Sequence, residues 1–280
     1  MIRLLLASVF LACAASLPAS ADTRDVYTVR NIEVDEQAAS VIEAREKAMS
    51  VARQKAARVL LTKITLSDDR ASAGGLPVDY ALAERLSAAV DVQEETAGAG
   101  RYRGVLSVVL NPLMVRAHLD SLGVPYVDTQ GPKSLIVPLA SNYQAQEAWR
   151  QALGADNPNA LAPYVTASNP GYTAFSDWSA FSTEAATVGA RRGVLAELEG
   201  RNGAYRTTLS TVTAAGTELL GTTNYATTLK GAADAAAEFL DEDWKRRSVI
   251  RGGTRTTTSA SVRYTSLAEW NTLRSALARS

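Results

Sequence analysis

The sequence predicts an α+β fold with two small mixed domains, each an antiparallel meander flanked by helices, and a C-terminal strand and helix. Stretches in which apolar and polar residues alternate are interspersed with stretches in which apolar residues recur at helical spacing. Glycine-bearing turns separate the strand-like stretches, and residues 124–133 are rich in proline and glycine. We therefore predict domains over residues 22–123 and 134–250, a linker over 124–133, and a separate end over 251–280.

Residues 1–21 have the pattern of a secretory signal peptide. Arg3 precedes an apolar run over residues 4–15, and Ala19 and Ala21 are the small residues of a cleavage site. The run is shorter than the roughly 20 residues that cross a bilayer, and no later run is long and apolar enough to do so. We expect cleavage after Ala21, export to the periplasm and no transmembrane segment in the mature chain.

The single cysteine of the chain, Cys13, lies inside this signal peptide. An alternative interpretation is a lipoprotein in which Cys13 is acylated and becomes the N-terminus. Ala12 suits that processing signal, whereas Phe10 replaces the leucine-like residue that it prefers. The cleavable signal peptide is favoured, and the mature chain then has no disulfide and depends on its core for stability.

The first domain is predicted to begin with a strand over residues 25–34, because apolar and polar residues alternate there. Residues 38–65 lack glycine and proline and carry small apolar residues on one face, which predicts a long helix with a capping box at Ser40 and Glu43. The remaining elements are, in order, a loop over 68–77, a helix over 80–90, strands over 90–96 and 101–110 joined by Gly98-Ala99-Gly100, and a helix from Asn111-Pro112 to Gly123.

The second domain is predicted to begin with a buried strand over residues 134–139, which Pro138 ends. The following elements are, in order, a helix over 143–153 capped by Asn142, an irregular segment over 157–172, a helix over 175–188, strands over 193–199, 204–213 and 218–226, and a helix over 229–248. The basic run Lys245-Arg246-Arg247 is interpreted as complementing the dipole of that last helix, and contact with anionic lipid head groups is the less favoured alternative.

The end of the chain is predicted to form a strand over residues 256–264 and a helix that a capping box at Ser266 and Glu269 opens. A strand and a helix with nothing after them resemble the first half of a βαβ or ferredoxin-like unit. We therefore expect the natural domain to continue beyond the last residue.

The composition excludes several classes of function. The 29 basic and 29 acidic side chains balance, so the chain lacks the positive surface of a nucleic-acid-binding protein. His118 is the only histidine, and with no cysteine in the mature chain there are too few ligands for a transition-metal site. His118 lies within a predicted helix and is interpreted as a residue at the border of the core. We expect no cofactor and no nucleic-acid partner.

Acidic residues cluster at Asp68 and Asp69, with Asp79 nearby, and at residues 241–243. Two carboxylates that converge within about 10 Å catalyse glycoside hydrolysis, so a carboxylate-dependent hydrolase of a cell-wall or sugar substrate is an alternative function. A solvated loop and a solvated helix end explain the two clusters better. We assign no catalytic residue.

Tyr164, Tyr172, Phe175, Trp178 and Phe181 are the densest group of aromatic residues, in and after a segment that prolines interrupt. An irregular loop with aromatic side chains is a candidate binding surface for a peptide, a glycan or an envelope protein. The competing interpretation, which is favoured, is that these rings fill the core beneath a long loop. The group is nevertheless the best candidate binding site in the sequence.

Several stretches of the chain carry a family resemblance. They are Ala56-Ala57-Arg58-Val59-Leu60-Leu61-Thr62-Lys63-Ile64, Asn111-Pro112-Leu113 and residues 131–139 and 266–270. Together they resemble the exported bacterial proteins of the uncharacterised family DUF2066, which has no established activity to transfer. Lys63 stands where members usually carry arginine, and Gly131-Pro132 where they often carry Arg-Pro. Residues 134–248 also resemble in topology the N-terminal domain of TolB and similar envelope assembly modules.

Predicted export, near-neutral charge, the lack of catalytic groups and this resemblance favour a non-enzymatic periplasmic protein. We expect a binding or accessory module in cell-envelope assembly, with an envelope protein or a glycan as its partner. The alternatives are the hydrolase and a carrier of small molecules or lipids, and a carrier requires an apolar cavity of at least about 300 Å³.

Overall fold

The computed structural model of the chain describes residues 23–155, 157–251, 266–267 and 269–271. The predicted signal peptide with Cys13 and the strand predicted over 256–264 lie outside the described residues. The chain divides between Ile250 and Arg251 into two units. In the C-terminal unit, the Ser266 hydroxyl accepts a hydrogen bond from the backbone N–H of Glu269 at 3.2 Å. This bond is one of the two that define a capping box, so it confirms that part of the prediction.

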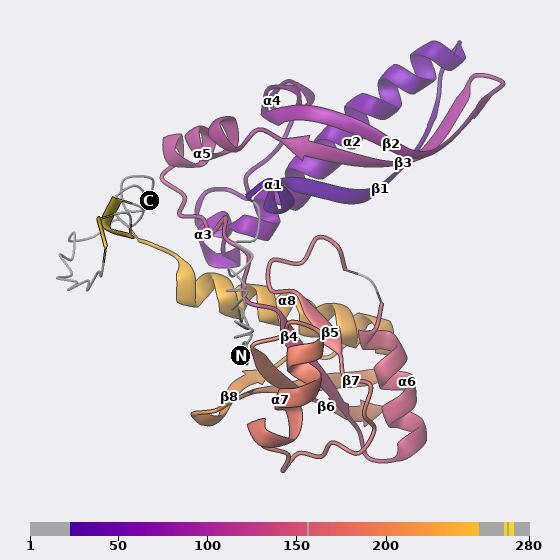
Figure 1. Ribbon diagram of the computed structural model, residues 1–280. Coiled ribbons are helices and arrows are strands. Elements are labelled where there is room, and N and C mark those ends of the chain that lie inside the picture. The colour runs from indigo at the N-terminus through magenta and orange to yellow at the C-terminus, as the bar shows by residue number, and fades with distance from the viewer. Residues whose placement is uncertain (1–22, 156, 252–265, 268, 272–280) are drawn as a thin grey trace, which may run out of the picture. The chain divides into compact units, whose positions relative to one another are not determined.

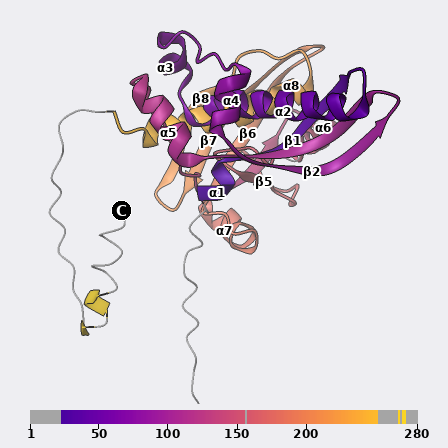
Figure 2. The same ribbon diagram turned by 90° about the horizontal axis from the view of Figure 1, so that it is seen from above.

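The protein has an α+β fold, as predicted, with two sheets that carry helices (Figures 1 and 2). The first sheet is antiparallel and has the strand order β1-β3-β2. Its strands are β1 (Thr28–Gln37), β2 (Ser87–Gly98) and β3 (Arg101–Leu110). The helices of this part of the chain are α1 (Thr23–Val26), α2 (Val41–Ile64), α3 (Ser67–Ser72), α4 (Tyr80–Leu86) and α5 (Pro112–Ser121).

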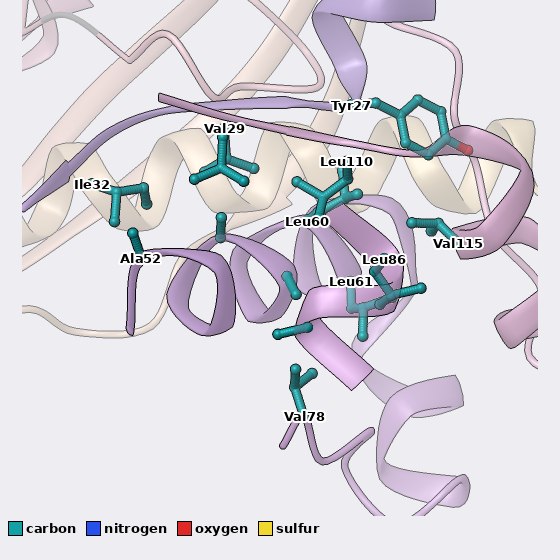
Figure 3. Packing of buried hydrophobic residues seen from close by; sticks show 14 of the residues in the cluster. Tyr27, Val29, Ile32, Ala52, Leu60, Leu61, Val78, Leu86, Leu110 and Val115 are labelled. Carbon is teal, nitrogen blue, oxygen red and sulfur yellow. The ribbon is translucent and has the colours of Figure 1, made fainter. Parts of the chain in front are cut away.

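Helix α2 begins and packs as its sequence predicts. The Ser40 hydroxyl accepts a hydrogen bond from the Glu43 N–H at 3.2 Å and caps the helix. Because alanine has no side-chain atom beyond Cβ, a row of alanines lets a helix lie close to a sheet. Four fully buried alanines spaced one turn apart form this row: Ala44, Ala48, Ala52 and Ala56. Larger side chains fill the rest of this core, such as Ile32 of β1 and Leu60, one turn after Ala56 on α2 (Figure 3).

The start of the first sheet differs from the prediction in two respects. Strand β1 begins at Thr28 rather than at residue 25, because residues 23–26 form a helical turn. The strand also does not alternate regularly, because its register shifts between Val29 and Ile32, where Asn31 has a φ of 60°. This bulge turns both Val29 and Ile32 toward the core although they are three residues apart.

Two further predictions for this part of the chain are wrong. Helix α4 ends at Leu86 and not at residue 90, because the residues from Ser87 onward pair with the end of β3. Pairing in the sheet overrides the helix propensity of the alanines at 88 and 89. The segment predicted as a loop contains α3, and the chain turns after it at Gly74 and Gly75, where φ is 76° and 85°.

The second sheet is mixed and has the strand order β5-β4-β6-β7-β8, in which β5, β4 and β6 are parallel and β6, β7 and β8 form an antiparallel meander. Its strands are β4 (Ser134–Leu139), β5 (Tyr164–Thr166), β6 (Arg192–Arg201), β7 (Ala204–Thr213) and β8 (Gly216–Thr222). Its helices are α6 (Tyr143–Leu153), α7 (Trp178–Thr187) and α8 (Leu229–Ser248). Helices α6 and α8 pack on one face of this sheet and α7 packs on the other.

Most predicted bounds in this region are confirmed, namely those of β4, α6, β7 and α8. Pro138 does not end β4, because the parallel pairing with β6 continues to Leu139. The segment predicted as irregular contains β5, since residues 164–166 pair with the start of β4. Helix α7 begins at Trp178 after its cap Asp177, so that Phe175 lies outside the helix.

The residues predicted as a linker are packed rather than loose. Val124 and Val127 are buried in the core beneath the first sheet, and the Val127 N–H donates to the Ile64 oxygen at 2.8 Å. The Gly131 N–H donates to the Leu161 oxygen at 2.8 Å. A Cβ on Gly131 would lie 3.1 Å from the ring of Trp244, so this close approach favours glycine.

Candidate functional site: the open face and edge of the first sheet

The hairpin between β2 and β3 turns at Ala99 and Gly100, which have φ values of 48° and 72°. Two successive positive φ angles are typical of a type I′ turn, which suits the twist of paired antiparallel strands. The Ala38 N–H donates to the Gly100 oxygen at 2.9 Å, and a Cβ on Gly100 would lie 2.7 Å from the Ala38 oxygen. The predicted turn is therefore confirmed, and Gly100 is required there.

Strand β2 is an edge of the first sheet, and its outer side is open. Among the described residues it pairs with β3 alone. Every residue from Asp91 to Gly98 is exposed, whereas most of β3 is buried or half-buried. An edge strand presents backbone N–H and C=O groups to which another strand can be added.

Strand β1, the other edge, is partly blocked. The Asn159 side chain accepts a hydrogen bond from the Arg30 N–H at 2.9 Å and donates one to the Arg30 oxygen at 3.0 Å. One amide side chain therefore satisfies both backbone groups of an edge residue, as a neighbouring strand would. The first sheet is thus closed at Arg30 and open along β2.

The sheet face opposite α2 forms the floor of the candidate site. The strand register places Glu33, Val105 and Glu94 in one row and Asp35, Arg103 and Thr96 in the next. These residues, together with Lys55, line a surface cavity of about 700 Å³. Because side chains paired across a ladder point to the same face, the cavity lies over an uncovered sheet surface.

A second bulge concentrates negative charge on this face. Asp91 pairs with Ser107 and Glu94 pairs with Val105, and the register shifts between Val92 and Glu94. Ser107 and Val105 are alternate residues of β3 and share a face. The bulge therefore places Asp91 and Glu94 on one face although their sequence separation of three would place them on opposite faces of a regular strand.

The carboxylates of this face differ in their partners. Asp35 accepts a hydrogen bond from Arg101 Nε at 2.6 Å and lies 3.3 Å from Arg103 Nε, and the Arg101 guanidinium in particular lowers the pKa of Asp35. Glu33, Asp91 and Glu94 have no cationic partner among the described side chains. Lys55 Nζ donates to the main-chain oxygen of Glu33 at 2.8 Å and not to its carboxylate.

This arrangement has the features of a binding surface. The cavity lining contains neither histidine nor cysteine and no serine beside a base, so it presents no catalytic pair that depends on those residues. It offers backbone hydrogen-bonding groups along β2 and uncompensated negative charge beside them. This site was not predicted from the sequence, although the almost wholly polar run over residues 91–96 is a signal of a strand with both faces in water.

The structure does not bring the five predicted aromatic residues onto one surface. Tyr172 and Phe181 are buried with their rings edge to face, 4.8 Å apart, and Trp178 packs half-buried against the same core. Tyr164 packs against the core on the other face of the second sheet, where burial raises its pKa to about 12. Of the five, Phe175 alone is fully exposed, at 96%. The group mainly fills core, which is the interpretation that the sequence favours, because the irregular segment folds back over the sheet.

None of the three aspartates of the hydrolase alternative lines the cavity that neighbouring residues form. Asp79 caps α4, accepting a hydrogen bond from the Leu82 N–H at 2.7 Å, and Asp68 and Asp69 lie in the first turn of α3. The cavity beside these helices, of about 350 Å³, is lined by basic, apolar and small residues: Arg58, Leu61, Thr62, Arg70, Gly75, Leu76, Pro77 and Val78. We therefore place no acid–base pair there.

The acidic cluster near the end of α8 is not a solvated helix end. The Asp241 carboxylate accepts a hydrogen bond from the Ala162 N–H at 2.6 Å, and burial raises the pKa of Asp241. Asp243 is 8% exposed and accepts a hydrogen bond from Arg247 Nε at 3.0 Å. These carboxylates hold the helix against neighbouring segments, so they are structural.

The basic run that follows is divided between interior and surface. Lys245 is 3% exposed and donates to the main-chain oxygen of Thr65 at 2.8 Å, near the end of α2. Lys245 is therefore unavailable to a lipid head group, and it complements the end of α2 as well as its own helix. Arg246 is exposed, and Arg247 pairs with Asp243 and Glu218.

His118 is half-buried on α5, and burial together with the charge of Arg85 lowers its pKa. The described part of the chain contains no group of three or more side chains that could hold a metal ion. In that same part, no helix combines the length and the apolar character that crossing a membrane requires.

Comparisons with known proteins identify no family for the chain. No protein family and no curated protein matches it. A crystal structure of TolB from Acinetobacter baumannii matches with a TM-score of 0.26 and 13% sequence identity. The match covers 41% of this chain and 28% of the TolB chain, and a similarity this low supports no inference about fold or function.

Proposed function

We propose that the protein is exported to the periplasm and acts there as a non-enzymatic binding module in cell-envelope assembly. The binding site in this proposal is the open face and outer edge of the first sheet. The observation that carries it is strand β2, which is exposed from Asp91 to Gly98 beside a cavity of about 700 Å³. Exposed edge strands favour unwanted association, so proteins usually shorten or cover them. A long uncovered edge is consistent with a surface kept for a partner.

The export step of the proposal rests on residues 1–21. Their basic start, apolar run and small residues before Asp22 fit a cleavable signal peptide. The mature chain that follows has no cysteine and so needs no disulfide chemistry in an oxidising compartment.

Crosslinking in intact cells tests the proposal. The full chain is treated with a mild lysine-reactive reagent, and its adducts are purified from the periplasmic and envelope fractions and mapped by mass spectrometry. We expect one recurrent envelope partner joined through Lys55, which lines the cavity, and not through Lys230, which is exposed on α8.

Arginine substitutions provide the control, because they keep the charge and remove the reactive amine. Lys55→Arg should abolish the adduct and Lys230→Arg should leave it unchanged. Recovery of the protein without any partner, from every fraction, would contradict the proposed function.

A further inference from the structure

We infer that the outer edge of β2 binds an extended segment of a partner protein, rich in lysine or arginine, as an additional strand of the first sheet. This inference rests on the proposed function and specifies the chemistry of its partner. Strand addition supplies affinity through backbone hydrogen bonds and specificity through alternate side chains.

The register shows which backbone groups of β2 are free. The main-chain oxygen of Gly100 accepts a hydrogen bond from the Ala38 N–H, so the backbone groups of Gly100 point to the β1 side of β3. Successive residues of a strand direct their backbone N–H and C=O groups to opposite edges. The backbone groups of residues 101, 103 and 105 of β3 therefore point toward β2. Their partners on β2 are Gly98, Thr96 and Glu94, and the backbone groups of these three residues point toward β3. Glu95 and Ala97 therefore direct their N–H and C=O groups to the open side.

The charge beside this edge determines which side chains fit. Asp91 and Glu94 share the open face because of the bulge between them, and neither has a cationic partner among the described side chains. Glu33 lies in the same row as Glu94, across β3. A residue on an added strand opposite Glu94 would have its Cβ about 5 Å away, a distance at which opposite charges stabilise the pair. Lysine or arginine at alternate positions is therefore the complementary pattern.

The same features exclude a second copy of the chain as the occupant. Pairing of two β2 strands would bring the acidic run 91–95 of one copy beside that of the other. Like charges directly opposite each other destabilise a strand pair. The bulge and the charges therefore suppress pairing between copies and select for a basic segment.

Synthetic peptides as long as the stretch from Asp91 to Gly98 test this inference on the full mature chain. The probes are an alternating Lys-Val peptide, its Glu-Val counterpart, and the Lys-Val peptide with an N-methyl group on every amide, so that neither of its edges can donate to β2. Binding is measured by fluorescence anisotropy. We expect the Lys-Val peptide alone to bind, more weakly as salt is raised because exposed charges are screened.

Two variants of the protein locate the binding. Ala97→Pro removes an outward N–H, and loss of one hydrogen bond should weaken binding of the Lys-Val peptide at least about fivefold, whereas Ala97→Val should not.

Glu94→Lys should weaken binding of the Lys-Val peptide by about tenfold at low salt. Glu238→Lys, on the exposed side of α8, makes the same change in net charge and should have no effect. Equal binding of all three peptides, or equal effects of Glu94→Lys and Glu238→Lys, overturns the inference.

A photoreactive residue at Gln93 separates this inference from the proposed function. A partner crosslinked at Gln93 in cells, and displaced by excess Lys-Val peptide, supports both. A partner that crosslinks through Lys55 but never through Gln93 leaves the proposed function intact and overturns strand addition at β2. A crosslink from Gln93 to a second copy of the chain also overturns it.

Discussion

The ammonium group of Lys245, near the end of α8, donates a hydrogen bond to the main-chain oxygen of Thr65, just after the end of α2, across an Nζ–O distance of 2.8 Å. The main-chain oxygen of Thr62, at 3.2 Å, and the Glu242 carboxylate, at 2.7 Å, are its other acceptors. The last carbonyl groups of a helix have no partner within the helix. Here Lys245, far along the chain, donates to these groups together with Arg70 of α3.

Replacing Lys245 by methionine should strongly destabilise the protein. The change removes the ammonium group that pairs with the buried Glu242 carboxylate and leaves Arg70 as the remaining side-chain donor to the carbonyl groups of Thr62 and Thr65. Breaking a buried pair on one side costs about 3 kcal/mol. We expect the free energy of unfolding, measured by urea denaturation, to fall by that amount. Lys230→Met is the control: it removes the exposed pair with Asp234, which contributes less than about 1 kcal/mol. Similar losses for the two variants would show that Lys245 does not hold α2.

Asn159 should contribute to stability through the edge of β1. Asn159→Ala removes both hydrogen bonds to Arg30, and each buried or half-buried backbone group left unsatisfied costs about 1 kcal/mol or more. We expect a loss of about 2 kcal/mol and faster amide exchange at Arg30. The exposed Asn157, mutated in the same way, should change stability by less than about 0.5 kcal/mol. An unchanged exchange rate at Arg30 would contradict the assigned role.

Stability should rise with pH through the titration of Lys63. Its Nζ donates to the Val26 oxygen at 2.9 Å, and burial lowers its pKa from 10.5 to about 8, which the charge of Asp241 partly opposes. Between these two values the unfolded chain binds more protons than the folded protein, so the free energy of unfolding increases with pH. We expect an increase of about 2 kcal/mol from pH 8 to pH 10.

Urea denaturation at several pH values, with Lys63→Met as the control, measures this contribution. The variant lacks the titrating group and should show a flatter profile over the same range. Tyr27 and Tyr164 have raised pKa values and therefore reduce stability only above about pH 10. Identical slopes for the wild type and Lys63→Met below pH 10 would rule out this explanation.

Gly200 should tolerate no side chain. Its φ is 100°, and an added Cβ would lie 1.9 Å from the Ala204 oxygen across the β6–β7 hairpin. Gly200→Ala should therefore lower the free energy of unfolding by about 3 kcal/mol or more. Gly98→Ala is the matched control, because nothing lies within 4 Å of its Cβ position, and it should be nearly neutral. Thermal denaturation followed by circular dichroism distinguishes the two, and equal melting temperatures would contradict the prediction.

The mature protein should begin at Asp22, and its mass should correspond to that N-terminus. Intact mass spectrometry of the protein purified from cells distinguishes cleavage after Ala21 from acylation at Cys13, which adds lipid mass. Cys13→Ser should leave processing and localisation unchanged. A lipid-modified N-terminus would replace the predicted soluble periplasmic form with an anchored one.

Local signals made much of the fold predictable. Ser40, Asn111 and Asn142 mark helix starts through side chains that bond the next turn, and the structure shows each of these caps. The β2–β3 turn follows from the conformational freedom of its glycine. Errors arose where a distant strand decided the outcome, as when pairing with β3 ended α4 at Leu86.

The candidate site was much less predictable. Aromatic residues attract a binding interpretation because they are large and can face a ligand, yet Tyr172 and Phe181 lie in the core. The open edge of β2 left only a weak signal, its run of polar residues. Whether a polar strand is an edge depends on which strands lie beside it, and those pairings involve residues far away in the chain.

By itself, the sequence determined the α+β class, the alanine face of α2 and most helix starts, because these depend on the spacing of residues within a few turns. Tertiary structure alone decided that Asp91 and Glu94 share a face, that Asn159 closes the edge at Arg30, and that Lys245 is buried against α2. Each of these outcomes depends on a strand register or a contact between segments that are distant in the sequence. The pattern of neighbouring residues in either segment does not reveal the free energy of such a contact.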